Sequence, residues 1–335
     1  MRFKGAFNIP EGESYYKLNI SFPGEHYNFN TASQLESNHR VFMNLANWSG
    51  DVDFPNGTMQ VSLGNSPLFN GVVNIPESVT NCESMFYLSP NFNRPITIPN
   101  SVTDCYQMFL DCNKFDQSVV IPDSVTNCAY MFQGDKALDS VVTIGSGANN
   151  CFGLFGGCTN FDQPVNVPDN VHDARSMFFG CSKLNEPITI GNSIVDYLSM
   201  FENCISLNSH ITFNKQISEY FSFQRMFMNC ISYNQPVSLP DNSSAVSMFY
   251  GCTNFSAAVT IGNNCDCATM FAGCTNMNVP VTIPESTRNV TSMFAGCTSM
   301  GSTIQLPRNL FETKYESNLL KLKWSSQARN CISLY

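Results

Sequence analysis

The sequence has few charged side chains and no cluster of basic ones. Lysine and arginine number 17 and aspartate and glutamate 26 among 335 residues, so charged residues make up 13% of the chain and its net charge is −9. Binding to nucleic acid or to an anionic membrane surface depends on patches of lysine and arginine. The composition therefore argues against both classes of partner.

Long hydrophobic runs are absent as well. No stretch approaches the roughly 18 apolar residues of a membrane-spanning helix. The N-terminal residues MRFKGAFNIPEGESYYKLN also have no apolar run of the kind that a signal peptide needs. We therefore expect neither membrane insertion nor export by a signal peptide.

A repeated dipeptide, Met-Phe, is the most prominent pattern in the sequence. Successive copies stand mostly 23 residues apart and twice 22, and one step of 26 places an insertion between Asn214 and Arg225. From Val41 to Pro307 the chain holds about twelve copies of one unit of about 23 residues, a period typical of stacked repeats. The first residues of the dipeptides are Met85, Met108, Met131, Met177, Met200, Met226, Met248, Met270 and Met293, with Leu154 in the one gap.

The first half of each unit has apolar residues three before, at, one after and four after the Met, which is helical spacing. Gly or Asn stands three residues after the Met, for example Gly134, Gly273 and Asn203. These residues tolerate the left-handed conformation that ends many helices. The pattern predicts one short helix or helical turn in each unit.

The second half of each unit alternates in the manner of a short strand, as in Ile96-Thr97-Ile98 and Val281-Thr282-Ile283. Alternation of period two places the Val and Ile side chains inward and the middle side chain outward. One strand and one helical turn cannot bury their own apolar faces, so successive units must stack. We expect a leucine-rich-repeat-like solenoid over residues 41–310, with an N-terminal cap over 1–40 and a C-terminal cap or attachment segment over 311–335.

The unit MFAGCTNMNVPVTIPESTRNVTSMF resembles the BspA-like leucine-rich repeats of bacterial surface proteins and of some bacteriophage virion proteins. The resemblance extends from about Val41 to Pro307, although Met, Phe and Cys stand where better-known units have Leu. It implies a solenoid used for adhesion or display, without catalytic residues.

Most of the 15 cysteines fall in two columns, three before and four after the Met, as in Cys105 and Cys112. Small buried hydrophobic residues explain such columns better than disulfides or metal ligands, because free cysteine is among the most buried residue types. The pair Cys265 and Cys267 lacks the second pair of ligands that a zinc site needs. We expect reduced thiols and no metal.

The four histidines stand at unrelated positions of the unit, and the glycines follow the repeat and not a phosphate-binding loop. We therefore expect no enzyme and no cofactor, and interpret the histidines as surface residues.

The outward column of the strands is the feature with a functional shape, because a flat face rich in hydroxyl groups suits many weak contacts. The plain alternative is that Thr simply favours exposed strands. We expect a non-enzymatic binding protein whose partner is a protein or a cell-surface glycan. The leading hypothesis is a bacteriophage virion component that contacts the host or other virion proteins. The alternatives are a bacterial surface adhesin and an intracellular scaffold. The candidate binding residues are Thr97, Thr143, Asn166, Thr189, Thr212, Ser238, Thr260 and Thr282.

Overall fold

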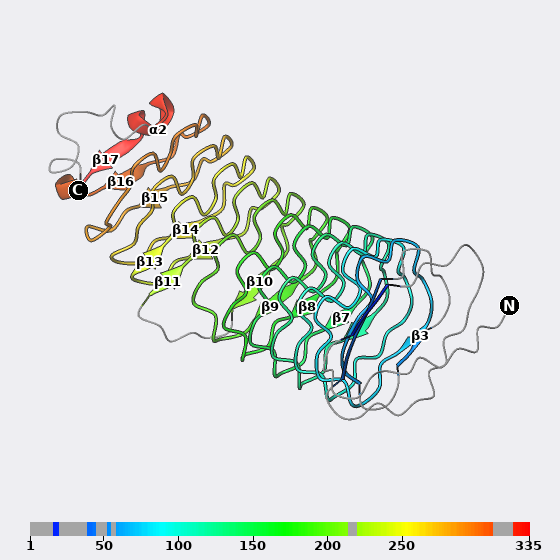
Figure 1. Cartoon of the computed structure of the whole chain (residues 1–335). Helices are drawn as coiled ribbons and strands as arrows, with labels where there is room; N and C mark the ends of the chain where they lie inside the picture. Colours follow the sequence, from blue (N-terminus) through cyan, green and yellow to red (C-terminus); the bar gives the residue numbers. More distant parts are fainter. Residues whose placement is uncertain (1–15, 20–38, 45–51, 55–57, 214–219, 311–323) are drawn as a thin grey trace, which may run out of the picture. The chain divides into compact units, whose positions relative to one another are not determined.

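The computed structural model describes residues 16–19, 39–44, 52–54, 58–213, 220–310 and 324–335. The chain forms two compact units, Met1–Asp173 and Ala174–Tyr335. Within each unit the backbone winds through successive coils of about 23 residues, and every pairing of described strands is parallel (Figure 1). The predicted repeat solenoid is therefore confirmed.

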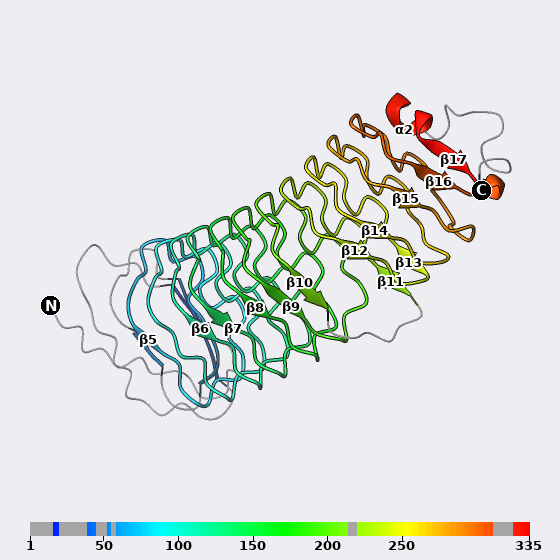
Figure 2. The same ribbon diagram turned by 180° about the vertical axis from the view of Figure 1, so that it is seen from behind.

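The strands are short, since each coil contributes only two or three residues to most of them. Figure 2 shows β5 to β8 in successive parts of the first unit. The strands of that unit are β1 (Tyr16–Asn19), β2 (His39–Asn44), β3 (Val52–Asp53), β4 (Thr58–Ser62), β5 (Val73–Asn74), β6 (Val119–Val120), β7 (Val142–Thr143) and β8 (Val165–Asn166).

The second unit repeats this plan and ends in a short helix and a strand. Its elements are β9 (Ile188–Ile190), β10 (Ile211–Phe213), β11 (Phe221–Ser222), β12 (Val237–Ser238), β13 (Ser243–Ser244), β14 (Val259–Thr260), β15 (Val281–Thr282), β16 (Ile304–Leu306), α2 (Ser326–Asn330) and β17 (Ile332–Leu334). Among the helices described in either unit, none is long and apolar enough to cross a bilayer.

Stacked phenylalanine rings form the core of each unit. In the first unit the rings of Phe86, Phe109 and Phe132 follow one another at 5.3 and 5.4 Å between centroids and are nearly parallel. In the second unit Phe201 lies 5.2 Å from Phe178 and 5.6 Å from Phe227. All six rings are buried. The Phe of the repeated dipeptide therefore joins each coil to the next.

The predicted short helix before and around the Met is not confirmed. In the coil of Met85 the N–H groups alternate between two partners: Met85 bonds to Cys82 within the coil, whereas Phe86 bonds to Met108 of the next coil. The residue directly before the Met is left-handed, with φ of 54° at Ser84. An α-helix allows neither feature, so this half of the coil is a series of tight turns.

The predicted left-handed residue after the Met is confirmed. Gly134 and Gly273 have φ of 81° and 80°, and Asn203 has φ of 64°. Each ends the series of turns, and the residue that follows is buried: Cys204 after Asn203, Cys274 after Gly273, and Asp135 in place of a Cys after Gly134.

The segments expected to be caps are only partly described. In the first unit β1 pairs with β2 and so extends a sheet toward the N-terminus. In the second unit Trp324 packs edge-on against Phe294 at 4.8 Å, and β17 pairs with β16. These contacts cover the last coil, and the role of the terminal segments as caps stays a prediction.

Candidate binding surface

The outward column of the strands lies where the sequence predicts it. Val119 and Val142 are buried and in register, while Val120 and Thr143 beside them are exposed. The second unit repeats this with Thr189 beside Thr212 and with Ser238 beside Thr260. Thr189 is half-buried and the other predicted residues are exposed, namely Thr97, Thr143, Asn166, Thr212, Ser238, Thr260 and Thr282. Their outward position is confirmed, and their role in binding stays a prediction.

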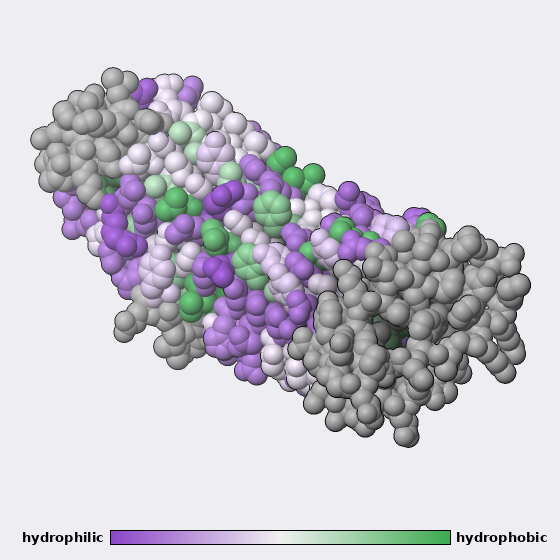
Figure 3. Space-filling view, in the orientation of Figure 1, coloured by the Kyte–Doolittle hydropathy of each residue, from purple (hydrophilic) through white to green (hydrophobic). Residues whose placement is uncertain are grey.

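Thr97 differs from the others because it lies outside any described strand. Its neighbours Ile96 and Ile98 are nevertheless buried, so the inward and outward alternation is kept without ladder hydrogen bonds. The face is also not purely polar, since Val120 is 66% exposed. The face seen in Figure 3 is mostly hydrophilic, with apolar residues in small separate groups.

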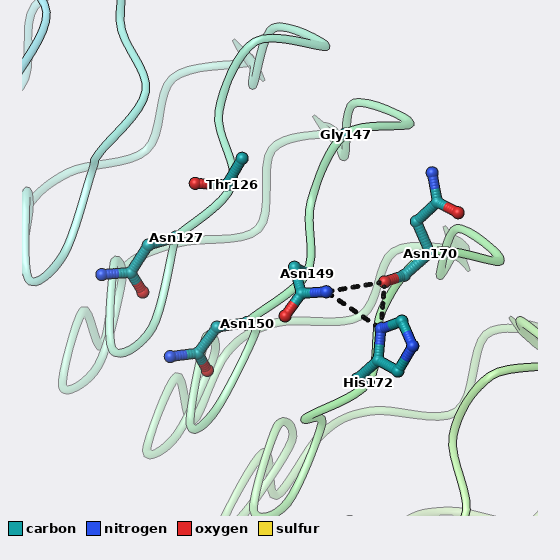
Figure 4. Close-up of a pocket in the computed structure, with 7 residues that line it drawn as sticks. All are labelled: Thr126, Asn127, Gly147, Asn149, Asn150, Asn170 and His172. Carbon is teal, nitrogen blue, oxygen red and sulfur yellow. Dashed lines mark hydrogen bonds between the residues drawn. The ribbon is translucent and has the colours of Figure 1, made fainter.

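An open polar pocket of about 520 Å³ lies in the first unit, and the sequence did not predict it. It is lined by three successive coils at the corner that follows the strand, and its lining residues are Thr126, Asn127, Gly147, Asn149, Asn150, Asn170 and His172 (Figure 4). Asn149 and His172 occupy equivalent positions 23 residues apart, which is the signal in the sequence that could have placed them together.

The histidine of this pocket is held by two neighbours. Its Nδ1 lies 2.9 Å from Asn149 Nδ2 and 2.8 Å from the carbonyl oxygen of Asn170 (Figure 4). One ring nitrogen cannot accept from the amide and donate to the carbonyl at once. The tautomer of His172 therefore decides which bond forms, and donation to Asn170 leaves Nε2 as an acceptor. His210 is exposed, and the side chains of His26 and His39 lie outside the described residues.

Most of the abundant asparagines have a structural role that the sequence analysis missed. In one column the side-chain oxygen accepts the N–H two residues on, as Asn150 does from Phe152. In another it accepts the N–H of the equivalent residue of the next coil, as Asn93 does from Asp116 and Asn208 from Asn234. These bonds satisfy backbone groups at the corners of the coil, so an abundance of Asn is not in itself a sign of binding.

The predicted burial of the cysteines is confirmed. In the column after the Met the thiols donate to a carbonyl of the preceding coil, as Cys112 does to Phe86 at 2.9 Å and Cys230 to Phe201 at 2.9 Å. Burial raises the pKa of Cys252 to about 12, which keeps the thiol protonated and weakly nucleophilic. Within the described part of the chain no three side chains of His, Cys, Asp and Glu are grouped as metal ligands.

One match decides the family of the chain. The family described as "Mycoplasma protein of unknown function, DUF285" matches over residues 59–144, 121–194, 149–264 and 244–314. The chain belongs to this family. The four overlapping matches along one chain agree with the repeat that the Met-Phe spacing defines.

A solved structure shows that this chain has the leucine-rich-repeat fold. A leucine-rich repeat protein from Bacteroides ovatus matches with a TM-score of 0.53 and 17% identity, over 95% of this chain and 92% of that chain. A leucine rich cell surface protein from Faecalibacterium prausnitzii matches with a TM-score of 0.44 and 15% identity, over 100% of this chain and 89% of that chain. No curated protein matches the sequence. The leucine-rich-repeat fold that the sequence resemblance implied is confirmed by the Bacteroides ovatus structure.

Proposed function

We propose that this DUF285 protein is a non-enzymatic binding protein that uses the outward strand face for many weak contacts with a macromolecular partner. The supporting observation is that this face presents exposed, mostly hydroxyl-bearing side chains at the same position of coil after coil, such as Thr143, Thr212 and Thr260. Within each unit, a regular row of donors and acceptors suits a partner that is itself extended, because each contact adds a small increment.

The chemistry of the described interior supports binding over catalysis. Thiols are the strongest nucleophiles of this chain, but burial raises the pKa of Cys82 and of Cys297 to about 12. A thiol held protonated reacts slowly, so the cysteine columns act as packing groups.

The proposed place of action is a bacterial surface. Membership of a family described from Mycoplasma favours a bacterial source, whereas the virion component that the sequence first suggested would need a bacteriophage origin. Two measurements separate the settings. Protease treatment of intact cells should remove the protein if it stands on the cell surface, and finding it instead in purified virus particles would contradict the proposal.

The binding face is tested by replacing Thr143, Thr189, Thr212 and Thr260 together with Ala and measuring adsorption of the labelled protein to bacterial and epithelial cells. We expect each single replacement to change adsorption little and the quadruple variant to lose most of it. A matched variant with Ala at Thr103, Ser206, Thr298 and Ser299, which are exposed off this face, should adsorb normally. Full adsorption of a folded quadruple face variant would overturn the proposal.

A further inference from the structure

Three aromatic residues form a cluster on the outside of three successive coils of the first unit. The rings of Tyr106 and Tyr130 meet edge-to-face at 6.0 Å, and those of Tyr130 and Phe152 at 4.9 Å. All three side chains are half-buried, in contrast to the buried stack of Phe109 and Phe132. This aromatic cluster (Tyr106, Tyr130 and Phe152) therefore presents ring surface to solvent.

A glycine makes room for the central ring of the aromatic cluster. Gly153 stands directly before Leu154, where other coils place a side chain such as Gln107 or Ser176 in the same left-handed conformation. A Cβ at Gly153 would lie 2.8 Å from Cδ1 of Tyr130, closer than real contacts allow. The missing side chain thus lets the ring of Tyr130 lie against the neighbouring coil, in a fixed position.

The polar pocket of Figure 4 lies beside the aromatic cluster. Cys151 points into the core, so its two neighbours in sequence, Asn150 and Phe152, both face outward. Asn150 therefore lies between the pocket and the aromatic cluster. Its side chain is held in place because its Oδ1 accepts a hydrogen bond from the backbone N–H of Phe152 at 3.1 Å.

The pocket retains hydrogen-bonding groups that the described residues do not use. Asn150 engages only its Oδ1, and Asn149 engages only its Nδ2, which leaves one amide donor and one amide acceptor on adjacent residues. No lining residue carries a permanent charge. The carboxylate of Asp104 in the preceding coil is occupied by Asn127 and by the N–H of Tyr106.

Aromatic rings beside neutral amides match the chemistry of a sugar ring, which has an apolar C–H face and hydroxyl groups at its edge. The pocket of about 520 Å³ is open to solvent, so it suits one part of an extended ligand and does not enclose a whole small molecule. A protein partner would need about 800 Å² on each side for a stable interface, far more than three half-buried rings offer. An anionic sugar is disfavoured because the chain is acidic, with a net charge of −9.

We propose that the aromatic cluster and the polar pocket together form a subsite for a neutral oligosaccharide. The proposal rests on the proposed binding function and names its ligand class. The ring of Tyr130 stacks on the C–H face of one sugar residue, and the ring of Phe152, which stands at 67° to it, contacts the edge of the same sugar residue. The amides of Asn149 and Asn150 bond to neighbouring hydroxyl groups.

Saturation-transfer NMR on the full chain tests the subsite. The probes are neutral tetrasaccharides of β-1,4-linked glucose, β-1,4-linked N-acetylglucosamine and α-1,4-linked glucose, with a tetrasaccharide of galacturonic acid as the anionic comparison. We expect at least one neutral probe to bind and the anionic one to bind more weakly. Tyr130→Ala should weaken binding by about two- to tenfold, the usual value of one aromatic contact, while Tyr130→Phe should bind as the wild type does.

The control is Tyr250→Ala in the second unit, which removes an exposed tyrosine outside the aromatic cluster and should leave saccharide binding unchanged. Thermal unfolding of each variant verifies that it is folded. Absence of binding by every neutral probe up to about 10 mM, or equal binding by folded Tyr130→Ala, would overturn the subsite. Binding of a proline-rich decapeptide in place of any saccharide would overturn the ligand class.

The two proposals fail in different ways. If Tyr130→Ala leaves cell adsorption intact while the quadruple threonine variant loses it, and no saccharide binds, the subsite is wrong and the proposed function stands. If the isolated tetrasaccharides bind but no variant changes cell adsorption, the subsite stands and the proposed strand face is wrong.

Discussion

At the scale of single residues, the cysteine column shows why this fold uses a thiol. The side chain must be small and apolar to fit between coils, yet a carbonyl of the preceding coil needs a donor. Cys204 meets both needs, with its Sγ 3.0 Å from the carbonyl oxygen of Phe178. Alanine would fill less space and donate nothing, and serine would be costlier to bury.

Alkylation of the column cysteines should be slow in the folded protein and fast after unfolding. Burial raises the pKa of Cys82, Cys252 and Cys297 to about 12, so the reactive thiolate is scarce at neutral pH. Cys331 is half-buried and serves as the internal reference that should be labelled first. Timed labelling with iodoacetamide, read by mass spectrometry of peptides, measures this order. Rapid labelling of the columns, or disulfides between most of them, would contradict it.

Asp135 occupies a position of the cysteine column, four residues after Met131. Its side chain is fully buried, and neither carboxylate oxygen has a hydrogen-bond partner within the described residues. Burial raises the pKa of Asp135 well above its usual range; the nearby backbone N–H of Cys112 offsets a smaller part of this rise, and the charge of Asp111 adds to it. Cys112, in the preceding coil, also faces it. The folded protein therefore favours the protonated acid at this position.

Replacing Asp135 with Cys should stabilise the first unit increasingly as pH rises. The unfolded acid releases its proton near pH 3.9, whereas the folded one keeps it, so wild-type stability falls above that pH by about 1.4 kcal/mol per pH unit until the folded pKa is reached. Urea unfolding from pH 4 to 9 should show the two curves diverging. Asp123→Asn is the control of opposite sign, because bonds from Ser146 lower the pKa of exposed Asp123. Parallel curves for Asp135→Cys and wild type would contradict the prediction.

At the scale of one coil, the sequence predicts the strand half well and the turn half poorly. The alternation in Val281-Thr282-Ile283 defines a face by itself, since only a strand has period two. Around Met85, by contrast, the spacing of the inward-pointing side chains is compatible with a helix and equally with a series of turns. What decides is the bond from Phe86 to Met108 in the next coil, and nothing local to the sequence encodes it.

The candidate sites also differ in how far the sequence predicts them. The exposed strand column follows from alternation alone, whereas the polar pocket depends on contacts between residues 23 apart, such as Asn149 and His172. The aromatic cluster needs, in addition, a left-handed glycine at Gly153. Reading the repeat by columns could have suggested these neighbours, but only the geometry of the turns shows that Tyr130 and Phe152 meet.

Truncation of a core ring should cost far more stability than truncation on the strand face. Phe201 is buried between Phe178 and Phe227, so Phe201→Ala should lower the free energy of unfolding by about 3 to 5 kcal/mol through lost burial and a cavity. Thr260→Ala, on the exposed column, should lower it by less than about 0.5 kcal/mol. Urea unfolding gives both values, and hydrogen exchange should localise the Phe201 effect to adjacent coils. Similar costs for the two variants would show that the ring stack is not what joins the coils.

At the scale of the whole molecule, each unit is a stack in which a coil contacts mainly its two neighbours. Such an array has no single centre, so its stability is a sum of interfaces between coils and its outer coils need a cover. The few charges of the chain add little to those interfaces. In the second unit an ion pair joins Arg225 and Glu202 at 2.7 Å, with the arginine half exposed. Function and stability are thus spread over many equivalent positions.

The C-terminal segment should stabilise the last coil of the second unit. Trp324 is buried, donates from its indole N–H to the carbonyl of Val290 at 3.1 Å, and covers the ring of Phe294. Removing residues 311–335 would expose that ring and the edge of β16. We expect lost hydrogen-exchange protection over residues 281–306 and a tendency to aggregate, because an uncovered strand edge and apolar coil recruit other chains.

Two point variants sharpen this last test. Trp324→Ala should lower the free energy of unfolding by about 3 to 5 kcal/mol, whereas Tyr335→Phe, which loses only the bond from its hydroxyl to the carbonyl of Ile283, should cost about 1 kcal/mol or less. Both variants keep the chain length unchanged, so they separate the contribution of the buried Trp324 side chain to stability from that of the hydrogen bond that attaches Tyr335. A truncated chain that stays soluble, with residues 281–306 fully protected, would mean that the segment is an arm for another molecule, because a coil left without its cover cannot keep its protection.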